Sequence, residues 1–264
     1  MKLLNGEIIS NEKYNDNLFK ISVFSPYICK ETKPGQFINV RCSHPGIIDP
    51  LLRRPFGIFE IEKKFNVFSV LYRIRGKGTR FLMGLKKGDI LDFIGPLGNG
   101  IDIGETRENV LLIGGGIGIA PLNLLAKQAG RMKKNVFFAA GFKNNDYFRW
   151  EEDLIELKIN YTIFTEDGSW GEKGLVSDYI WDNLKSFKDY DVYCCGPVDM
   201  LKALKRNYMG TDNKVTALLE EMMACGVGVC NGCVVKVKKG KRGFTYKKVC
   251  REGPAFNLRE VIFD

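Results

Sequence analysis

Residues 110–121 read Val110-Leu111-Leu112-Ile113-Gly114-Gly115-Gly116-Ile117-Gly118-Ile119-Ala120-Pro121, and this stretch decides how the middle of the chain folds. Four apolar residues are typical of a short buried strand, and the glycines after them permit a tight turn into a helix. The pyrophosphate of a dinucleotide can approach such a helix N-terminus, where free amides and the helix dipole favour anions. We expect this contact at Gly115, Gly116, Gly118 and Pro121. The glycines do not form a clean G-x-G-x-x-G motif, so a structural Gly-rich turn stays the alternative.

Strands and helices alternate from about residue 101 to residue 213. The strand-like segments are Val110–Ile113, Asn135–Ala140, Tyr161–Thr165 and Asp191–Cys194. The helix-like segments follow the glycines up to Met132 and recur at Glu151–Leu157, Leu175–Leu184 and Met200–Asn207. This alternation predicts a doubly wound α/β domain with a parallel sheet. Cys195-Gly196-Pro197 follows a strand, and would lie at the carboxyl edge where such sheets bind ligands. By itself the tripeptide is equally compatible with an ordinary turn.

The first 100 residues have the pattern of a small antiparallel barrel. Six short apolar runs are separated by turn formers, and they are Gly6–Ile9, Leu18–Phe24, Gln36–Arg41, Gly57–Ile61, Val67–Ile74 and Asp89–Ile94. Strands this short and this evenly spaced indicate an all-β barrel.

The barrel segment also contains residues suited to a flavin nucleotide. Arg53-Arg54-Pro55-Phe56-Gly57 offers guanidinium groups that can clamp a diphosphate and an aromatic ring that can pack on a flavin. Downstream stand Leu71-Tyr72-Arg73 and Gly76-Lys77-Gly78-Thr79, whose last two residues can offer amides and a hydroxyl to a phosphate. Taken alone, these residues also fit a basic strand edge without a ligand.

Four of the eight cysteines cluster near the C-terminus, where Cys225, Cys230, Cys233 and Cys250 have the spacing C-x4-C-x2-C-x16-C. The first three match the plant-ferredoxin pattern, and the glycines between them let a loop wrap closely around a cluster. The spacing favours a [2Fe–2S] cluster over structural zinc, which is more often held by two closely spaced cysteine pairs, and over unliganded thiols. Cys29, Cys42 and Cys194 fit small buried side chains.

Composition excludes several other classes of protein. The chain has 264 residues with 45% hydrophobic and 27% charged residues, which is ordinary for a soluble globular protein. The most apolar stretch, residues 110–126, contains four glycines and a proline, so we expect no membrane span and a cytoplasmic location. The net charge of +9 comes from scattered residues, which favours a solvated basic surface over nucleic-acid binding. Glu220-Glu221 is interpreted as helix-surface charge, and His44, the single histidine, as a loop residue without a role.

Together, the order of these motifs resembles the ferredoxin–NADP reductase superfamily from about residue 5 to residue 210. The resemblance implies a Greek-key barrel that binds FAD through Arg54, Pro55, Phe56, Gly57, Leu71, Tyr72, Arg73, Gly78 and Thr79. It implies NAD(P) on the second domain, with Cys195, Gly196 and Pro197 near the nicotinamide. Two departures are visible, since Phe56 stands where many members have Tyr, and Gly57 where they have Ser or Thr. A backbone amide would have to replace the missing hydroxyl near the flavin.

The tail narrows the resemblance. Glu220 to Cys233, followed by Tyr246-Lys247-Lys248-Val249-Cys250-Arg251-Glu252-Gly253-Pro254-Ala255-Phe256, is similar to the iron–sulfur subunit family of two-subunit, NAD-linked dihydroorotate dehydrogenases. The resemblance implies FAD, a [2Fe–2S] cluster and NAD as cofactors. It also implies an FMN-containing catalytic partner in a heterotetramer of two copies of each subunit, acting in pyrimidine biosynthesis. The expected domains are a barrel (1–100), an NAD-binding domain (101–213) and a cluster module (214–264).

Other members of the superfamily remain alternatives. They are flavin and iron–sulfur subunits of sulfide dehydrogenase, hydrogenase or ferredoxin:NADP oxidoreductase type, although the last tends to have an acidic residue where Cys225 stands. A redox sensor without turnover and a zinc-containing nucleic-acid-binding protein are more distant alternatives. The choice between NAD and NADP is open, because no ribose-discriminating residue is identifiable.

Overall fold

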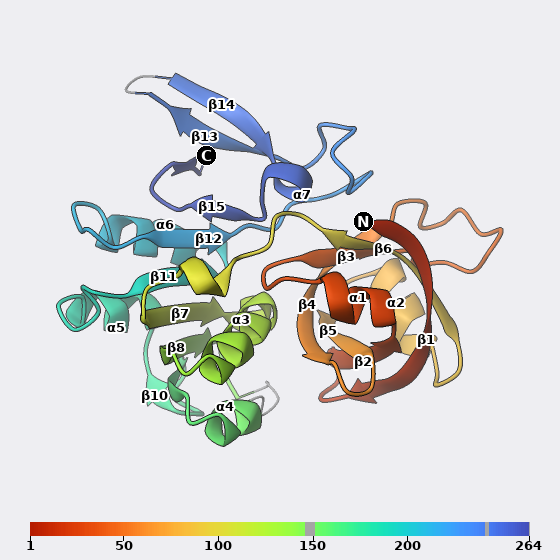
Figure 1. The fold of residues 1–264 in the computed structure, drawn as a ribbon, viewed down its shortest axis with the longest axis horizontal. Helices are drawn as coiled ribbons and strands as arrows, with labels where there is room; N and C mark the ends of the chain where they lie inside the picture. The colour runs from red at the N-terminus through yellow and green to blue at the C-terminus, as the bar shows by residue number, and fades with distance from the viewer. Residues whose placement is uncertain (146–150, 241–242, 264) are drawn as a thin grey trace.

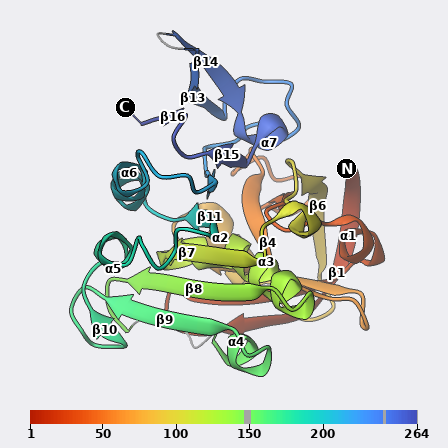
Figure 2. The ribbon, with the colours of Figure 1, turned by 60° about the vertical axis from the view of Figure 1, so that its left-hand side comes forward.

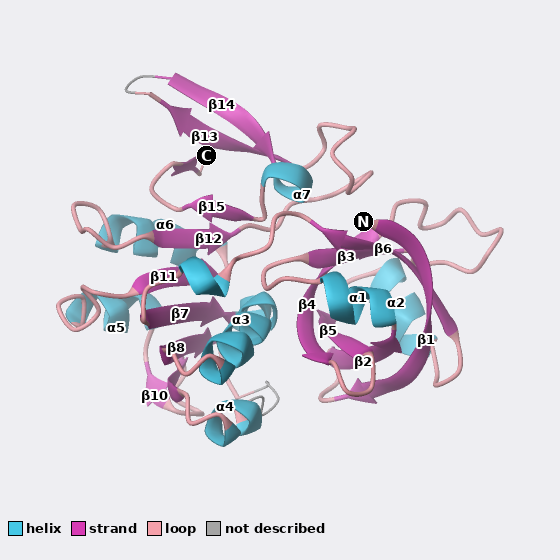
Figure 3. Ribbon diagram, in the orientation of Figure 1, coloured by secondary structure: helices cyan, strands magenta, loops and turns pink. Residues whose placement is uncertain are grey.

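The computed structural model describes residues 1–145, 151–240 and 243–263, and arranges them in a barrel, a seven-stranded sheet and a small three-stranded sheet (Figure 1). Most of the helices flank the seven-stranded sheet, as Figure 3 shows. Among the described residues, no helix is both long and apolar enough to cross a membrane. Asp264, the final residue of the expected cluster module, lies outside the described residues.

The first 97 residues form a closed antiparallel barrel, as the sequence predicts. Its strands are β1 (Lys2–Lys13), β2 (Leu18–Phe24), β3 (Phe37–Val40), β4 (Arg54–Glu62), β5 (Val67–Arg73) and β6 (Ile90–Leu97). They close in the order β1-β2-β5-β4-β3-β6. The interior is filled by alternate side chains such as Ile21, Ile38 and Phe68, each fully buried. Strand β1 is longer than predicted because it pairs with β2 and β6, which supports its polar ends as well as its apolar centre.

Two short helices interrupt the barrel strands where only turns were expected. They are α1 (Pro26–Glu31) and α2 (Lys77–Gly84). The Gly76–Thr79 segment is therefore the start of a helix, with Gly76 at its N-cap. Since the first amides of a helix have no partner inside it, this end of α2 presents free N–H groups.

The second region is a mostly parallel sheet in which strands are added on both sides of a central strand. Its strands are β7 (Asn109–Gly115), β8 (Asn135–Phe142), β9 (Asn160–Thr165), β10 (Glu172–Lys173), β11 (Asp191–Cys195), β12 (Val215–Leu218) and β15 (Ala255–Asn257). The order is β10-β9-β8-β7-β11-β12-β15, and only β15 is antiparallel to its neighbour. The strand order reverses between β7 and β11. Ligands bind such sheets at this switch point, beyond the carboxyl ends of the strands.

Helices cover both faces of the sheet (Figure 2). They are η1 (Ile103–Glu105), η2 (Gly116–Gly118), α3 (Ile119–Arg131), α4 (Glu152–Glu156), α5 (Val176–Asp182) and α6 (Val198–Asn207). Leu112 and Phe138 belong to the core beneath α3, whereas Leu111 and Ala139 belong to the core beneath α5 and α6. Successive residues of a strand point to opposite faces, so a strand covered on both sides is apolar throughout. This explains the continuous apolar run before the glycines.

The C-terminal segment is shared between two sheets. β12 and β15 extend the seven-stranded sheet, whereas β13 (Val234–Lys239), β14 (Gly243–Lys248) and β16 (Val261–Ile262) form a separate antiparallel sheet. The short helix α7 (Val249–Glu252) connects β14 to the return strand β15. The segment is thus tied to the α/β sheet through β12 and β15, before β16 returns to the small sheet. The boundary at residue 213 stays a prediction.

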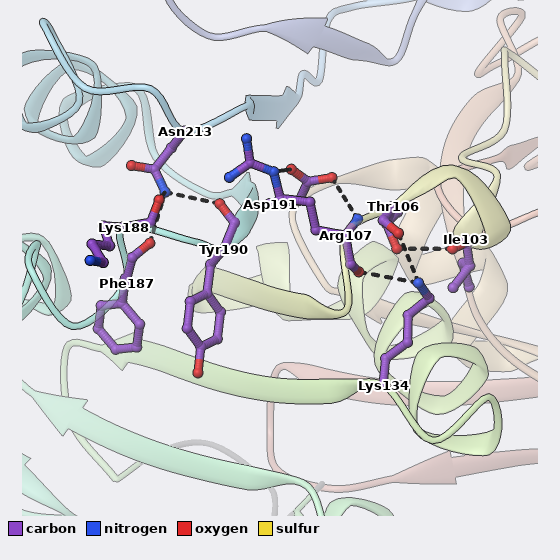
Figure 4. A network of polar contacts seen from close by, with 9 residues as sticks. All are labelled: Ile103, Thr106, Arg107, Lys134, Phe187, Lys188, Tyr190, Asp191 and Asn213. Atoms are coloured by element: carbon purple, nitrogen blue, oxygen red, sulfur yellow. Dashed lines mark hydrogen bonds and ion pairs between the residues drawn. The ribbon is translucent and has the colours of Figure 1, made fainter.

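Buried polar contacts fix the edge of the α/β sheet opposite the switch point (Figure 4). The Asn213 amide donates hydrogen bonds to the carbonyl oxygens of Phe187, Lys188 and Tyr190 at 2.8, 3.2 and 2.9 Å. The Asp191 carboxylate accepts from the Arg107 backbone N–H at 3.1 Å. These contacts join the loop before β11 to the start of β12, and β11 to the start of β7.

Asn213→Ala should destabilise the folded protein, because it removes a buried amide that donates hydrogen bonds to three carbonyl groups. The expected loss in free energy of unfolding is about 1–3 kcal/mol. Urea unfolding followed by circular dichroism would measure it. Asn135→Ala is the matched control, since the Asn135 amide is exposed and surface changes usually stay within about 0.5 kcal/mol. Equal losses in both variants would contradict this account.

Candidate redox site

The pairing of β4 with β5 ends before the start of β4 and the end of β5, and we call the region between these strand ends the flavin slot. Their pairing runs from Ile58↔Val70 to Glu62↔Val67, so residues 54–57 and 71–73 are not paired with each other. Residues 54–57 pair with β3 instead, and residues 71–73 pair with β2. The expected flavin-binding residues of both strands therefore border one opening, although they lie far apart in the sequence.

The N-terminus of α2 lies at the same opening. A Cβ atom added to Gly78 would lie 3.5 Å from Cγ of Arg54, which shows that the arginine stem passes over the helix start. Arg54 Nη1 donates to the carbonyl of Leu52 at 2.6 Å. The Thr79 hydroxyl accepts from the backbone N–H of Arg75 at 2.8 Å, so it stabilises the helix start. The free amides of α2 and the Arg54 guanidinium suit a phosphate group.

The Leu71 and Tyr72 side chains lie in hydrophobic cores and are almost fully buried. The Tyr72 hydroxyl donates to Asn11 Oδ1 at 3.0 Å, and burial raises the pKa of that phenol. The Phe56 ring meets the Tyr72 ring edge-on, with their centroids 6.2 Å apart. Because the Leu71 and Tyr72 side chains point into cores, only their backbone could contact a flavin nucleotide.

Helix α3 packs directly against the barrel beside this slot. A Cβ atom on Gly57 would lie 3.2 Å from Cβ of Pro121, so the glycine permits close approach of the helix. Asn123 Nδ2 donates to the Phe59 carbonyl at 3.3 Å, and Lys127 forms an ion pair with Glu60. Both charged side chains are largely buried. These contacts set the position of the glycine turn relative to the slot.

Two turns meet at the switch point of the sheet. A Cβ atom on Gly118 would lie 2.3 Å from the Cys195 carbonyl oxygen, and one on Gly196 would lie 2.9 Å from Cα of Gly115. A Cβ on Gly115 would also lie 2.7 Å from Cδ of Pro197. Gly116 differs, because its φ is +55° and nothing lies within 4 Å of its Cβ position. The structural interpretation of the glycines therefore accounts for Gly115 and Gly118, whereas Gly116 leaves space for a ligand.

Cys195 ends β11 and is buried beside the turn. Burial, and then the Glu220 carboxylate, raise the pKa of its thiol well above the ordinary value. Glu220 follows β12 in an irregular segment and is exposed, so its predicted surface position is confirmed and the predicted helix is wrong. Partial desolvation of its carboxyl raises the Glu220 pKa, and nearby Arg75 of the barrel opposes that rise. Its place near Cys195 could have been predicted, because Glu220 comes just after an apolar strand. Residues that follow parallel strands, such as Cys195, gather at the carboxyl edge of the sheet.

The four C-terminal cysteines form two pairs. The thiols of Cys225 and Cys230 interact with each other, as do those of Cys233 and Cys250, and Cys225 also acts electrostatically on Cys250. Gly226 and Gly228 have φ values of +68° and +85°, which let the loop curl around the sulfur atoms. The Asn39 side-chain amide donates to the Cys225 carbonyl at 3.5 Å and so connects the loop to the barrel.

Backbone amides point toward one of these sulfur atoms. Burial by itself would raise the pKa of the Cys225 thiol, but the N–H groups of Cys230, Val227 and Val229 outweigh it and lower that pKa to about 6. The Cys230 N–H lies 3.4 Å from Cys225 Sγ. Burial and the adjacent Cys233 raise the pKa of Cys250 to about 12. A thiolate, the form that binds metal, is thus favoured first at Cys225.

The two thiol pairs bear on the kind of metal site. A [2Fe–2S] cluster takes its four thiolates at two iron atoms, whereas a structural zinc draws four sulfur atoms to about 2.3 Å from a single point. In the described part of the chain, no three His, Cys, Asp or Glu side chains lie close enough together to hold a metal ion. The ligand set Cys225, Cys230, Cys233 and Cys250 stays a prediction, with which the two thiol pairs are compatible.

Comparisons with known families match two parts of this chain. Residues 112–206 match the oxidoreductase NAD-binding domain, and residues 220–262 match the iron–sulfur cluster binding domain of dihydroorotate dehydrogenase B. The electron transfer subunits of dihydroorotate dehydrogenase B (NAD(+)) from Bacillus cereus and Bacillus anthracis are each 36% identical to it. Each alignment covers 99% of both chains.

Solved structures agree with this result. A chain of the NADH-dependent reduced ferredoxin–NADP oxidoreductase, solved in work on flavin-based electron bifurcation, is 31% identical with a TM-score of 0.83. The match covers 97% of this chain and 89% of that one. A ferredoxin–NADP⁺ reductase from Neisseria gonorrhoeae with bound FAD and NADP is 14% identical with a TM-score of 0.64. That match covers 80% of this chain and 92% of the reductase, and it shows a shared fold.

Gly118→Ala should push the two turns apart, because its methyl group would meet the Cys195 backbone, which cannot rotate away. Overpacking of this kind costs about 1–3 kcal/mol, and it should also weaken nicotinamide binding. Thermal unfolding and titration with NADH would measure the two effects. Gly84→Ala is the control, since nothing lies within 4 Å of that Cβ position. Unchanged stability and NADH affinity in Gly118→Ala would refute the packing argument.

Lys127→Met should destabilise the protein by about 3–5 kcal/mol, because it leaves the Glu60 carboxylate buried without its main partner. The double variant Lys127→Met/Glu60→Leu should recover most of that loss, since it removes both charges. Chemical denaturation of all three proteins would test the difference. A double variant less stable than Lys127→Met would show that the pair contributes a net stabilisation that apolar packing cannot replace.

Proposed function

This chain belongs to the family of dihydroorotate dehydrogenase B electron transfer subunits, and from that membership we propose how its residues carry electrons. It is an oxidoreductase subunit that uses FAD, a [2Fe–2S] cluster and NAD in the oxidation of dihydroorotate to orotate. The observation that carries the proposal is the meeting of three candidate sites around β3, β4 and α3. Flavin, nicotinamide and cluster would then be neighbours.

In this proposal, the residues of each candidate site have a defined role in holding a cofactor. Arg54 and the start of α2 would hold the FAD phosphates, while the backbone of Phe56, Gly57 and residues 71–73 would border its ring. Gly116 would admit the dinucleotide, with Gly115, Gly118 and Gly196 keeping the two turns together. When bound, FAD exchanges a hydride with nicotinamide and single electrons with the cluster.

Residues of the barrel, of α3 and of the turn after β11 would orient the nicotinamide. The contact between Gly57 and Pro121 would set how closely the α3 side approaches the flavin slot. The Cys195 thiol, whose raised pKa keeps it neutral, would pack beside the nicotinamide with Gly196 and Pro197. The [2Fe–2S] cluster, which would pass electrons to the partner subunit, would be held by Cys225, Cys230, Cys233 and Cys250.

The partner in this proposal is an FMN-containing catalytic subunit, joined in a heterotetramer with two copies of each subunit. The name of the relatives, electron transfer subunit, supports the existence of a catalytic partner. A cytoplasmic location belongs to the same proposal. It is supported by the eight cysteines, all within the described residues, which form no disulfide.

A second candidate function is a subunit of a ferredoxin:NADP oxidoreductase. The 31% identity and TM-score of 0.83 to such a chain favour it. The cysteine at position 225 and the 36% identity to dihydroorotate dehydrogenase subunits favour the first. The ferredoxin:NADP oxidoreductase function would be favoured if reduced ferredoxin reduced the protein and the dihydroorotate-oxidising partner did not.

Anaerobic purification followed by flavin, iron and zinc assays tests the proposal. We expect about one FAD and about two irons per chain, with bleaching of the visible spectrum by NADH and not by NADPH. Cys230→Ser should lose the cluster and electron transfer to the partner while FAD stays bound. Cys29→Ala is the control, since that buried thiol lies outside the paired cysteines. About one zinc per chain without flavin, or loss of FAD with iron retained in Cys230→Ser, would overturn the assignment.

A further inference from the structure

The loop between β3 and β4 exposes an unusual amount of apolar surface. Ile47, Ile48, Leu51 and Leu52 are all exposed, with Ile48 and Leu51 at 77% each. Single exposed aliphatic residues are normal on a protein surface, but a contiguous group marks an interaction site. We call residues 47–52 the apolar loop.

Polar contacts hold the backbone of the apolar loop in place. The Ser43 hydroxyl donates to the Ile47 carbonyl at 3.0 Å, and the Arg54 guanidinium donates to the Leu52 carbonyl at 2.6 Å. Lys77, from α2, forms an ion pair with Asp49. The aliphatic side chains are therefore presented by a fixed backbone, which lowers the conformational entropy that binding would cost.

The apolar loop and the cysteine loop, residues 221–233, both adjoin strand β3. Asn39 contacts Gly226 and Cys225, and the chain runs from Asn39 into the apolar loop within eight residues. Figure 1 shows both loops at the same end of the barrel, near the N-terminus. The cysteine loop itself exposes Met222 (88%) and Val229 (82%). One face of the molecule thus carries the candidate cluster and two sets of exposed apolar side chains.

We infer that the apolar loop, with Met222 and Val229, is the docking surface for the FMN-containing catalytic subunit. The inference rests on the proposed function. Electrons must leave the cluster across an interface, so the partner has to cover the face that carries the paired cysteines. The core of a protein interface is apolar and poor in unpaired charge. Here Asp49 is paired with Lys77, and Arg53 with Asp92 at 2.8 Å.

Two other occupants fit this face less well. A membrane surface is usually bound by apolar residues flanked by cations that are free to meet lipid headgroups, whereas Lys77 and Arg53 are engaged with carboxylates. A second copy of this chain would cover the cysteine loop without supplying an electron acceptor. The catalytic subunit would cover the exposed apolar side chains and also exchange electrons with the cluster.

The test is the double variant Ile48→Ser/Leu51→Ser, prepared with its cofactors and mixed with the FMN-containing dihydroorotate dehydrogenase subunit of the same organism. Isothermal titration should show binding weakened by about 100-fold, the effect of truncating two interface anchors. FAD content, iron content and NADH-dependent dye reduction should equal those of the unchanged protein. The control Ile155→Ser/Leu175→Ser removes two exposed aliphatic side chains from the α/β domain and should bind normally.

Several results would overturn the inference. If Ile48→Ser/Leu51→Ser and the unchanged protein bind the catalytic subunit equally well, the apolar loop is not the docking surface. The proposed function would not be affected by that result. The inference would also fail if the substitutions abolished only self-association, seen by size-exclusion chromatography, or only binding to anionic phospholipid vesicles. Failure of the unchanged protein to bind the catalytic subunit would overturn the inference together with the proposed function.

Discussion

The contact between α3 and strand β4 is the constraint on which the arrangement of the candidate sites depends. Helix α3 begins at the glycine turn, and β4 begins at Arg54 beside the flavin slot. Because Gly57 has no side chain, Pro121 can approach the barrel closely. The buried Lys127–Glu60 pair then joins the helix to the strand further along. A shift of α3 would move the proposed dinucleotide turn away from the flavin slot, so in the proposed function this interface would set the geometry of hydride transfer.

The same contact gives a physical reason for Gly57, where related reductases have a hydroxyl-bearing residue. A side chain at this position would press against Pro121, since even a Cβ atom would lie 3.2 Å from the proline Cβ. A hydroxyl-bearing side chain at this position would therefore have to displace α3 from the barrel.

The C-terminal segment connects the redox sites because it contacts both the barrel and the α/β sheet. It enters through β12, forms the cysteine loop against Asn39 of the barrel, and returns through β15 to the seven-stranded sheet. Cys233 and Cys250 lie at the two ends of the β13–β14 hairpin, so strand pairing brings them together across 16 intervening residues. The apolar loop follows β3, the strand that contacts the cysteine loop, so the surface proposed for a partner adjoins the same barrel strand as the paired cysteines.

The sequence by itself determined the barrel, the parallel sheet and the cysteine pattern, since strand periodicity, glycine turns and ligand spacing are local properties of the chain. It did not reveal helix α2 or strand β15, because eight and three residues are too few for a reliable periodic signal. It also placed Glu220 on a helix, whereas this exposed residue lies in an irregular segment near Cys195 and Arg75 of other elements. Only the tertiary structure decided the flavin slot, the two cysteine pairs and the contact of Gly57 with Pro121. Each of these depends on residues distant in sequence that packing alone brings together.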